Sequence, residues 1–212
     1  MMEQKNIFKR FEGDQWFQRN SMDCLLSPDM SLIKKYSEEQ KGNLLEIGCS
    51  GGNKLNQVKG QMNGYGIDPS KEAIVSGLKN HHDLNLQVGT ADNLPFEDSA
   101  FKIVIFGFCL YLVDRSLLLK SISEADRVLQ NKGLMIITDF DPDVPTKRKY
   151  HHSEGIFTYK QSYQAILLAL PYYSEVEKIS YAHQSSNFHN NPQERIATTV
   201  LYKDFDSGYA DI

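Results

Sequence analysis

The sequence is short of the features that mark disulfide-bonded, zinc-binding and membrane-spanning proteins. Its 212 residues include three cysteines, Cys24, Cys49 and Cys109, which are far apart and form no C-x-x-C pair. Neither a disulfide framework nor a metal site is therefore expected. No apolar run approaches the roughly 20 residues that a transmembrane helix needs. Residues 1–16 are charged and lack the apolar core of a signal peptide. We expect a cytoplasmic protein with no membrane span.

Positive charge is also scarce. The chain has 23 Lys and Arg against 27 Asp and Glu, a formal net charge of −4. Because nucleic-acid-binding proteins usually carry a basic surface, no nucleic-acid partner is expected, and a small-molecule substrate is favoured. The length suits one α/β domain over residues 1–212. We divide it into an N-terminal helical segment (1–40), a central core (41–140) and a substrate-side loop, helix and strand pair (141–212). The oligomeric state is left open.

The middle of the chain alternates between strand-like and helix-like segments. Short apolar runs predict strands at 44–47, 64–67, 84–88, 101–106 and 134–138, with helices at 53–59, 70–79 and 115–129 between them. Further on we expect a loop at 139–153, a helix at 159–170, and antiparallel strands at 174–181 and 196–203. This order predicts an α/β fold, a doubly wound and mostly parallel seven-stranded sheet with an antiparallel C-terminal strand and helices on both faces.

A glycine-containing turn follows the first predicted strand. Residues 48–52 read Gly-Cys-Ser-Gly-Gly, and glycines in such a turn let the backbone approach a ligand closely. The carboxylate of Glu46, at the end of the strand, is suited to accept hydrogen bonds from an amine or a hydroxyl. A tight turn beside a solvated glutamate is the structural alternative.

Two more acidic residues follow the next two strands. Asp68 comes 20 positions after Gly48, which is the usual place of the ribose-hydroxyl acceptor in nucleoside-binding α/β folds. Its alternative role is to cap the helix that begins near Pro69. Asp92 follows the third strand and is placed to accept from an exocyclic adenine amine. Because ligands of doubly wound sheets bind at the carboxyl ends of the strands, Glu46, Asp68 and Asp92 are expected to face one site.

Together with residues 101–106, these motifs resemble the class I S-adenosylmethionine-dependent methyltransferases (type 11/12-like) over roughly residues 44–139. The resemblance implies a Rossmann-like fold whose core, 41–140, binds S-adenosylmethionine. In that family the glycine turn contacts the methionine part of the cofactor, the second-strand acid binds the ribose, and the third-strand acid meets the adenine. On this basis we expect cofactor contacts from Glu46, Gly48, Cys49, Ser50, Asp68, Pro69, Ala91, Asp92, Asn93 and Phe108. The sequence departs from the family at Ser50, often a glycine, and at Lys102, often an aspartate.

An NAD(P)-dependent oxidoreductase is the competing interpretation. Its fingerprint is G-x-G-x-x-G, because a pyrophosphate must sit against a helix N-terminus. Counted from Gly48, this chain has Ser50 and Asn53 where the second and third glycines belong. S-adenosylmethionine carries no phosphate and makes no such demand, so we favour a methyltransferase. A protein that binds S-adenosylmethionine without catalysis stays open as a third interpretation.

The methyl acceptor is expected between the N-terminal segment, the exit of the fourth strand and the segment after the fifth. An alcohol acceptor benefits from a general base, for which His151, His152 and Tyr111 are candidates. The aromatic and polar residues of these segments predict substrate contacts from Trp16, Arg19, Asn20, Tyr150, Tyr159 and Lys160. Helix packing for Trp16 and solvent exposure for the histidines are the alternatives. Residues 13–20 and 147–160 also faintly resemble methylases of bacterial nonulosonic-acid and surface-glycan biosynthesis, which implies a sugar or glycan precursor.

Overall fold

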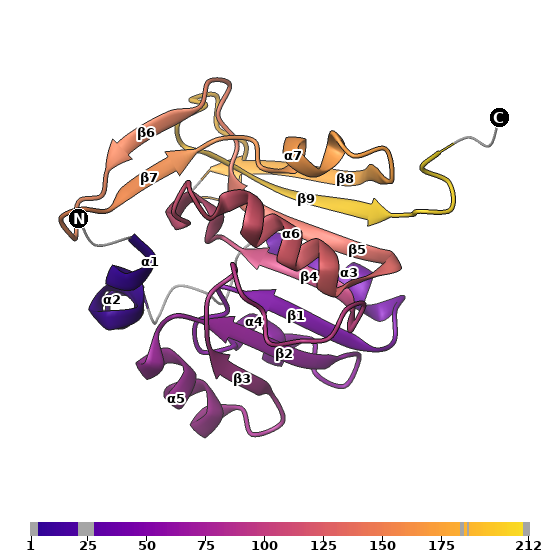
Figure 1. Cartoon of the computed structure of the whole chain (residues 1–212), viewed down its shortest axis with the longest axis horizontal. Helices are drawn as coiled ribbons and strands as arrows, with labels where there is room; N and C mark the ends of the chain where they lie inside the picture. The colour runs from indigo at the N-terminus through magenta and orange to yellow at the C-terminus, as the bar shows by residue number, and fades with distance from the viewer. Residues whose placement is uncertain (1–3, 21–27, 183–184, 186, 210–212) are drawn as a thin grey trace.

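A seven-stranded sheet forms the centre of the protein (Figure 1). The structure, a computed structural model, describes residues 4–20, 28–182, 185 and 187–209. The strands lie in the order β3-β2-β1-β4-β5-β9-β8. Their bounds are Asn43–Ile47 (β1), Asn63–Asp68 (β2), Asn85–Val88 (β3), Phe101–Gly107 (β4), Leu129–Phe140 (β5), Tyr173–Ala182 (β8) and Arg195–Lys203 (β9). β1 to β5 pair in parallel, and β9 runs antiparallel to both β5 and β8. The predicted fold is confirmed.

Helices cover both faces of this sheet. On one face lie α3 (Asp29–Glu38), α4 (Asn53–Gln57) and α5 (Lys71–Asn80), whose Ile33, Leu55 and Ile74 share a buried cluster with Leu44 of β1. On the other face lie α6 (Leu118–Val128) and α7 (Gln164–Leu168), which pack in a cluster with Leu45. Because successive β1 residues are buried on opposite faces, the strand appears in the sequence as an uninterrupted apolar run.

The N-terminal residues form a helical run across the end of the sheet where the parallel strands finish (Figure 1). It consists of α1 (Gln4–Ile7), the π-helix η1 (Phe8–Glu12) and α2 (Gly13–Asn20). On one side, Asp14 Oδ1 accepts hydrogen bonds from Ser70 Oγ at 2.7 Å and from the Glu72 amide at 3.0 Å, at the start of α5. On the other, Gln4 Nε2 donates to the carbonyls of Leu112 (2.6 Å) and Phe157 (2.9 Å). Hydrogen bonds therefore hold the N-terminal helical run at both sides of the sheet edge.

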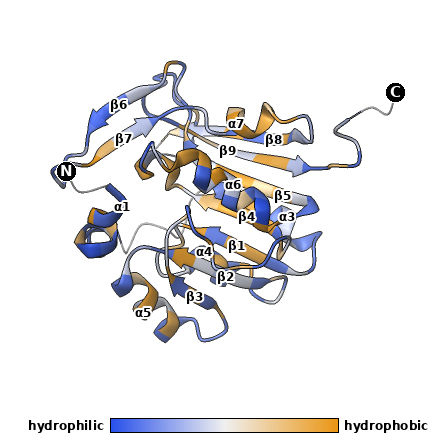
Figure 2. Cartoon of the chain, viewed as in Figure 1, coloured by the Kyte–Doolittle hydropathy of each residue, from blue (hydrophilic) through white to orange (hydrophobic). Residues whose placement is uncertain are grey.

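The segment after β5 differs from the prediction. In place of the loop at 139–153 and the helix at 159–170, β6 (Thr146–Lys149) pairs antiparallel with β7 (Phe157–Lys160), and α7 covers only Gln164–Leu168. β6 reads Thr-Lys-Arg-Lys and is coloured as hydrophilic in Figure 2, so it has none of the alternation that predicts a strand. This hairpin is a separate two-stranded sheet at the same end of the molecule as α1 and α2 (Figure 1).

The cysteines form no bridge in the described part of the chain. Cys49 and Cys109 are both free, and Cys24 lies outside the described residues. Within the same ranges, no group of three or more His, Cys, Asp or Glu side chains is placed to hold a metal ion. None of the described helices combines the length and the apolar character that crossing a membrane requires.

Candidate functional site

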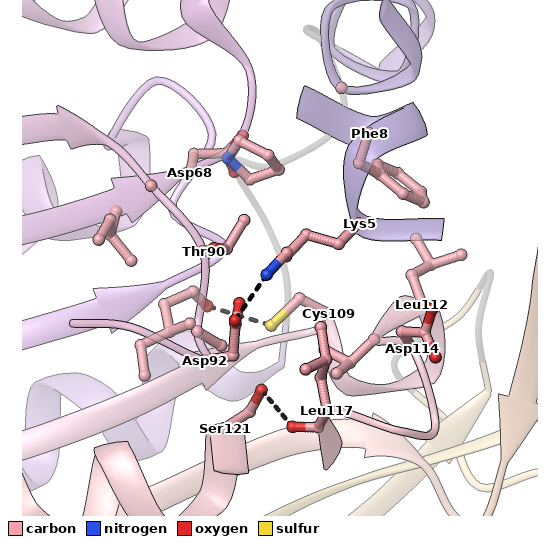
Figure 3. A pocket seen from close by; sticks show the side chains of 18 of the residues that line it. Lys5, Phe8, Asp68, Thr90, Asp92, Cys109, Leu112, Asp114, Leu117 and Ser121 are labelled. Atoms are coloured by element: carbon pink, nitrogen blue, oxygen red, sulfur yellow. Dashed lines mark hydrogen bonds and ion pairs between the residues drawn. The ribbon is translucent and has the colours of Figure 1, made fainter. Parts of the chain in front are cut away.

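A pocket of about 850 Å³, counted with its open mouth, lies where β1, β2 and β4 end (Figure 3). Among the residues predicted from the sequence, those that line it are Trp16, Gly48, Asp68, Pro69, Ala91, Asp92 and Phe108. The sequence reasoning missed other lining residues, which include Lys5, Phe8, Thr90, Gly107, Cys109 and Asp114. Cys109 lies in the fourth-strand exit that the sequence did mark, whereas no motif marks Lys5 or Phe8.

Two glycines leave the floor of the pocket without side chains. Gly48 has a φ of +77°, and a Cβ there would stand 2.7 Å from Cys109 Cβ. A Cβ on Gly107 would stand 2.5 Å from Glu46 Oε1. Neither position accepts a larger residue without displacing its neighbours, so the backbone itself faces the ligand. Cys49 instead points into the core below the turn and is 4% exposed.

Asp68 closes the turn from the end of β2. Its Oδ2 accepts from the Ser50 amide at 2.9 Å and its Oδ1 from the Ser70 amide at 2.8 Å. Burial raises the pKa of Asp68 to about 6, although both amides act in the opposite direction. Because each carboxylate oxygen has two lone pairs, Asp68 retains acceptor capacity toward the pocket. Ser50 therefore orients the Asp68 carboxylate through the hydrogen bond from its backbone amide.

Asp92 is held by a lysine from the N-terminal run. Lys5 Nζ reaches from α1 to Asp92 Oδ2 at 2.8 Å, with Phe8 on the same wall (Figure 3). Burial works to raise the pKa of Asp92, but the hydrogen bonds from Lys5 and Thr90 outweigh it and lower the pKa. Asp92 is therefore ionised at neutral pH. The neighbouring Asn93 is exposed, and its amide closes a turn on the Thr90 carbonyl at 3.2 Å.

Glu46 belongs to a buried cluster of charges beneath the glycine floor. It is 1% exposed, and its Oε2 finds no hydrogen-bond partner among the described residues. Burial raises its pKa to about 7, opposed by the charge of Lys54. Lys54 Nζ pairs with Asp29 Oδ2 at 2.5 Å, and Asp29 Oδ1 also lacks a partner within the described ranges. The oxygen of Glu46 that has no donor suits a ligand group that donates hydrogen bonds, such as an ammonium.

Aromatic rings form one wall of the pocket, which Phe108 lines. Tyr111, of the 3₁₀-helix η3 (Leu110–Leu112), packs against Phe108 and Phe140 with ring centroids 5.0 and 5.2 Å away. Burial raises the pKa of the Tyr111 phenol, and the Trp16 side chain hydrogen-bonds to it. Asp139, at the end of β5, accepts from the Tyr111 amide at 3.1 Å, which fixes η3 beside the pocket.

Three of the predicted acceptor-side residues lie around α2. Arg19 Nη2 donates to Glu12 Oε1 at 2.5 Å and to the Tyr150 hydroxyl at 3.2 Å. Asn20 Nδ2 donates to the Trp16 carbonyl at 2.8 Å, so its amide group serves the helix end. Of these residues only Trp16 lines the pocket, whereas Arg19 and Tyr150 contact each other outside its lining. Glu12 joins them, and the sequence reasoning did not select it.

The remaining predicted residues lie away from the pocket lining. Lys160 Nζ donates to the Gln193 carbonyl and stands 3.8 Å over the Phe140 ring. Tyr159 stacks under the Arg115 guanidinium, 4.4 Å from its ring centroid. His151 and His152 are exposed in the turn of the β6–β7 hairpin, so their position lends no support to a role as base.

Comparisons with known proteins agree with this site. The model of a methyltransferase domain matches residues 45–137. A ubiquinone/menaquinone biosynthesis C-methyltransferase, UbiE, of Citrifermentans bemidjiense is 27% identical over 132 residues, which cover 57% of this chain and 55% of that protein. The chain thus spans about half the length of this curated relative.

Two solved structures share the fold. The 1,6-didemethyltoxoflavin-N1-methyltransferase of Burkholderia thailandensis, with 1,6-didemethyltoxoflavin and S-adenosylhomocysteine bound, is 13% identical, with a TM-score of 0.68, over 94% of this chain and 85% of that one. The N-methyltransferase NodS of Bradyrhizobium japonicum, in complex with S-adenosylhomocysteine, is 16% identical, with a TM-score of 0.66, over 95% and 99% of the two chains.

The domain match and the geometry lead to the same family. The matched residues 45–137 hold the glycine floor and the acids that end β1, β2 and β3. The cofactor implied by this arrangement is S-adenosylmethionine, whose ammonium, ribose and adenine each call for a hydrogen-bond acceptor. Residues 45–137 match the methyltransferase domain, and the chain has the fold of the class I S-adenosylmethionine-dependent methyltransferases.

Proposed function

We propose that this protein transfers the methyl group of S-adenosylmethionine to a small polar acceptor. The observation that carries the proposal is the pocket at the carboxyl ends of β1, β2 and β4, with its bare glycine floor and three acidic side chains around it. Relatives and structural neighbours named as C- and N-methyltransferases support it. The two free cysteines are in keeping with a reducing, cytoplasmic location.

We assign the cofactor contacts by matching charge to chemistry. Asp68 accepts from the ribose hydroxyls through the lone pairs that its two amide donors leave free. Asp92 accepts from the adenine amine, with Ala91 against the base. The unpartnered oxygen of Glu46 and the bare backbone at Gly48 suit the methionine ammonium. The other predicted residues of this group, Cys49, Ser50, Pro69 and Asn93, shape the turns that hold these acids.

The acceptor would bind between the glycine floor and the aromatic wall. When bound, the cofactor supplies an already activated methyl group, so the protein has to position the acceptor and exclude water. Trp16 and Phe108 line this part of the pocket, and Tyr111 lies behind them. Since burial raises the pKa of Tyr111, its phenol stays protonated and serves as a hydrogen-bond partner rather than a base. A sugar or glycan precursor is our first candidate acceptor, on the strength of the sequence resemblance alone.

Calorimetry with S-adenosylhomocysteine tests the cofactor site. We expect saturable binding at one site per chain, weakened in Asp68→Ala and unchanged in the exposed control Glu39→Gln. No binding to the folded protein would refute the proposal. Methyl transfer from labelled S-adenosylmethionine to small-molecule acceptors then separates an enzyme from a non-catalytic binding protein, which would bind the cofactor but transfer no label.

A further inference from the structure

The N-terminal helical run and the β6–β7 hairpin carry an excess of positive charge that the rest of the chain does not share. Residues 4–20 and 146–160 hold eight Lys and Arg against three Asp and Glu, whereas the rest of the chain holds 15 against 24. The formal charge of the two segments is therefore +5, and that of the remainder is −9. A protein of net charge −4 thus has its positive charge gathered in two short segments.

Contacts between the two segments join their charges into one surface. Gln4 Nε2 donates to the Phe157 carbonyl at 2.9 Å, and the Phe157 amide donates to Gln4 Oε1 at 3.0 Å. The Phe8 and Tyr150 rings lie 6.4 Å apart between centroids, and Arg19 Nη2 donates to the Tyr150 hydroxyl at 3.2 Å. Both segments lie at one end of the molecule (Figure 1). Since the helical run also lines the pocket, the charged surface lies beside the candidate site.

Five cations of this surface are exposed. They form what we call the cationic surface: Lys9 and Arg10 of η1, and the consecutive Lys147, Arg148 and Lys149 of β6. None of the five forms an ion pair with any residue of the described ranges. Their charges are therefore available to a partner in solution.

The acids nearest to these cations are engaged by other side chains. Asp143, just before β6, pairs with Arg195 at 2.6 Å. Glu12, at the end of η1, is buried and pairs with Arg19 at 2.5 Å. Glu154, in the turn of the hairpin, is the one exposed acid within the two positively charged segments that has no ion pair among the described residues. The positive charge of the cationic surface thus stays largely uncompensated.

The arrangement of the cationic surface fits an extended anionic partner. All five cations are exposed, and none of them lines the pocket, so they do not enclose a single small anion. An exposed apolar side chain accompanies each group of cations. Phe11, 44% exposed, follows Arg10, and Val144, 67% exposed, lies two residues before β6. Exposed cations mixed with apolar side chains suit a membrane surface, where the cations meet anionic head groups and the apolar groups reach the acyl boundary.

We propose that the cationic surface binds the anionic head groups of a lipid membrane and holds the protein at that membrane without spanning it. The negative charge of the rest of the chain is repelled by the same head groups, so the protein binds with its pocket end toward the lipid. This inference goes beyond the proposed function and does not depend on it, because the five cations lie outside the pocket lining. A basic surface that only keeps the hairpin solvated is the structural alternative.

Vesicle sedimentation with the full chain tests the proposal. Vesicles made of equal parts of phosphatidylcholine and phosphatidylglycerol are compared with vesicles of phosphatidylcholine alone, in low-salt buffer and without cofactor. Each Lys or Arg near an anionic lipid surface strengthens binding about fivefold. We therefore expect binding to the anionic vesicles to be tighter by about tenfold or more. Raising NaCl to about 1 M, where the Debye length is about 3 Å, should release the protein.

Removing charge from β6 locates the binding surface. The triple variant Lys147→Gln, Arg148→Gln and Lys149→Gln should bind the anionic vesicles about tenfold or more weakly, because three cations leave the surface. It should bind S-adenosylhomocysteine as the wild type does, since β6 lies outside the pocket lining. If this variant does not fold, the pair Lys9→Gln and Arg10→Gln should weaken vesicle binding by about fivefold or more.

The matched control removes the same charge from elsewhere. Lys34, Lys41 and Lys79 are exposed and lie outside the two positively charged segments. Replacing all three by glutamine changes the net charge as much as the β6 variant does. Because attraction to the lipid falls off within a Debye length of the surface, this control should bind the anionic vesicles within about twofold of the wild type.

Several outcomes would overturn the proposal. They are no binding to the anionic vesicles, equal binding to anionic and neutral vesicles, or a loss in the β6 variant no larger than in the control. A single-stranded DNA oligonucleotide that binds more tightly than the anionic vesicles, and loses its binding in the β6 variant, would assign the surface to a nucleic acid instead. Failure of S-adenosylhomocysteine to bind the wild type would count against the proposed function alone, because vesicle binding is measured without cofactor.

Discussion

Replacing Glu46 by glutamine should stabilise the unliganded protein at alkaline pH and weaken its binding of the cofactor. Glu46 is 1% exposed, and burial raises its pKa from 4.5 to about 7. The folded state therefore binds this proton more tightly than the unfolded state does. Stability is greatest below the unfolded pKa, falls as the pH rises toward about 7, and is level above it. Because glutamine does not titrate, the Glu46→Gln variant does not lose stability in this way as the pH rises.

The expected size of the effect follows from the pKa difference. One pKa unit corresponds to about 1.4 kcal/mol, so a change from 4.5 to about 7 amounts to about 3 kcal/mol. Relative to the wild type, Glu46→Gln should therefore gain up to about 3 kcal/mol of unfolding free energy between pH 5 and pH 8. Asp68 and Asp139, whose pKa values burial raises to about 6 and about 7, are present in both proteins. The contribution of Asp139 is common to the two proteins, whereas the charge of Asp68 also acts on Glu46 and is part of its raised pKa.

Urea unfolding at pH 5 and pH 8 measures the difference, with the exposed Glu39→Gln as the control that should show none. In the same variant, the affinity for S-adenosylhomocysteine should fall about tenfold, because the ammonium loses a charged partner. Stability and affinity thus change in opposite directions. The reasoning is refuted if the gain in unfolding free energy of Glu46→Gln over the wild type is the same at both pH values. It is also refuted if that gain is smaller at pH 8 than at pH 5.

Three further predictions concern the cofactor pocket. Asp68→Ala should raise the dissociation constant for S-adenosylhomocysteine about tenfold or more, measured by calorimetry, because the ribose hydroxyls lose their acceptor. Gly107→Ala should lower the melting temperature and abolish that binding, since its Cβ would stand 2.5 Å from Glu46 Oε1; normal affinity would contradict the close fit. NADH should show no saturable binding in a fluorescence titration, because Ser50 and Asn53 replace the glycines that a pyrophosphate requires. Saturable binding would revive the oxidoreductase interpretation.

The sheet and the acidic residues at the carboxyl ends of its parallel strands were predictable because their signals are local. The apolar run of β1 stops at a glycine turn, and the 20 residues from Gly48 to Asp68 span one helix and one strand. Right-handed crossovers then bring the ends of successive strands to one edge. The same logic placed Asp92 and the antiparallel pair β8–β9. The helix predicted from residue 70 is likewise found as α5, where the Ser70 hydroxyl accepts from the Ala73 amide at 3.0 Å.

The acceptor side was decided by contacts between distant parts of the chain. Lys5 meets Asp92 across 87 positions and Arg19 meets Tyr150 across 131, and no periodicity within the sequence encodes such pairs. β6, one strand of the hairpin that presents Tyr150, is polar throughout, so it gave no strand signal. Glu12 shows the distinction most clearly. In the sequence it is one more charged residue, and only the packing of the N-terminal helical run buries it and pairs it with Arg19.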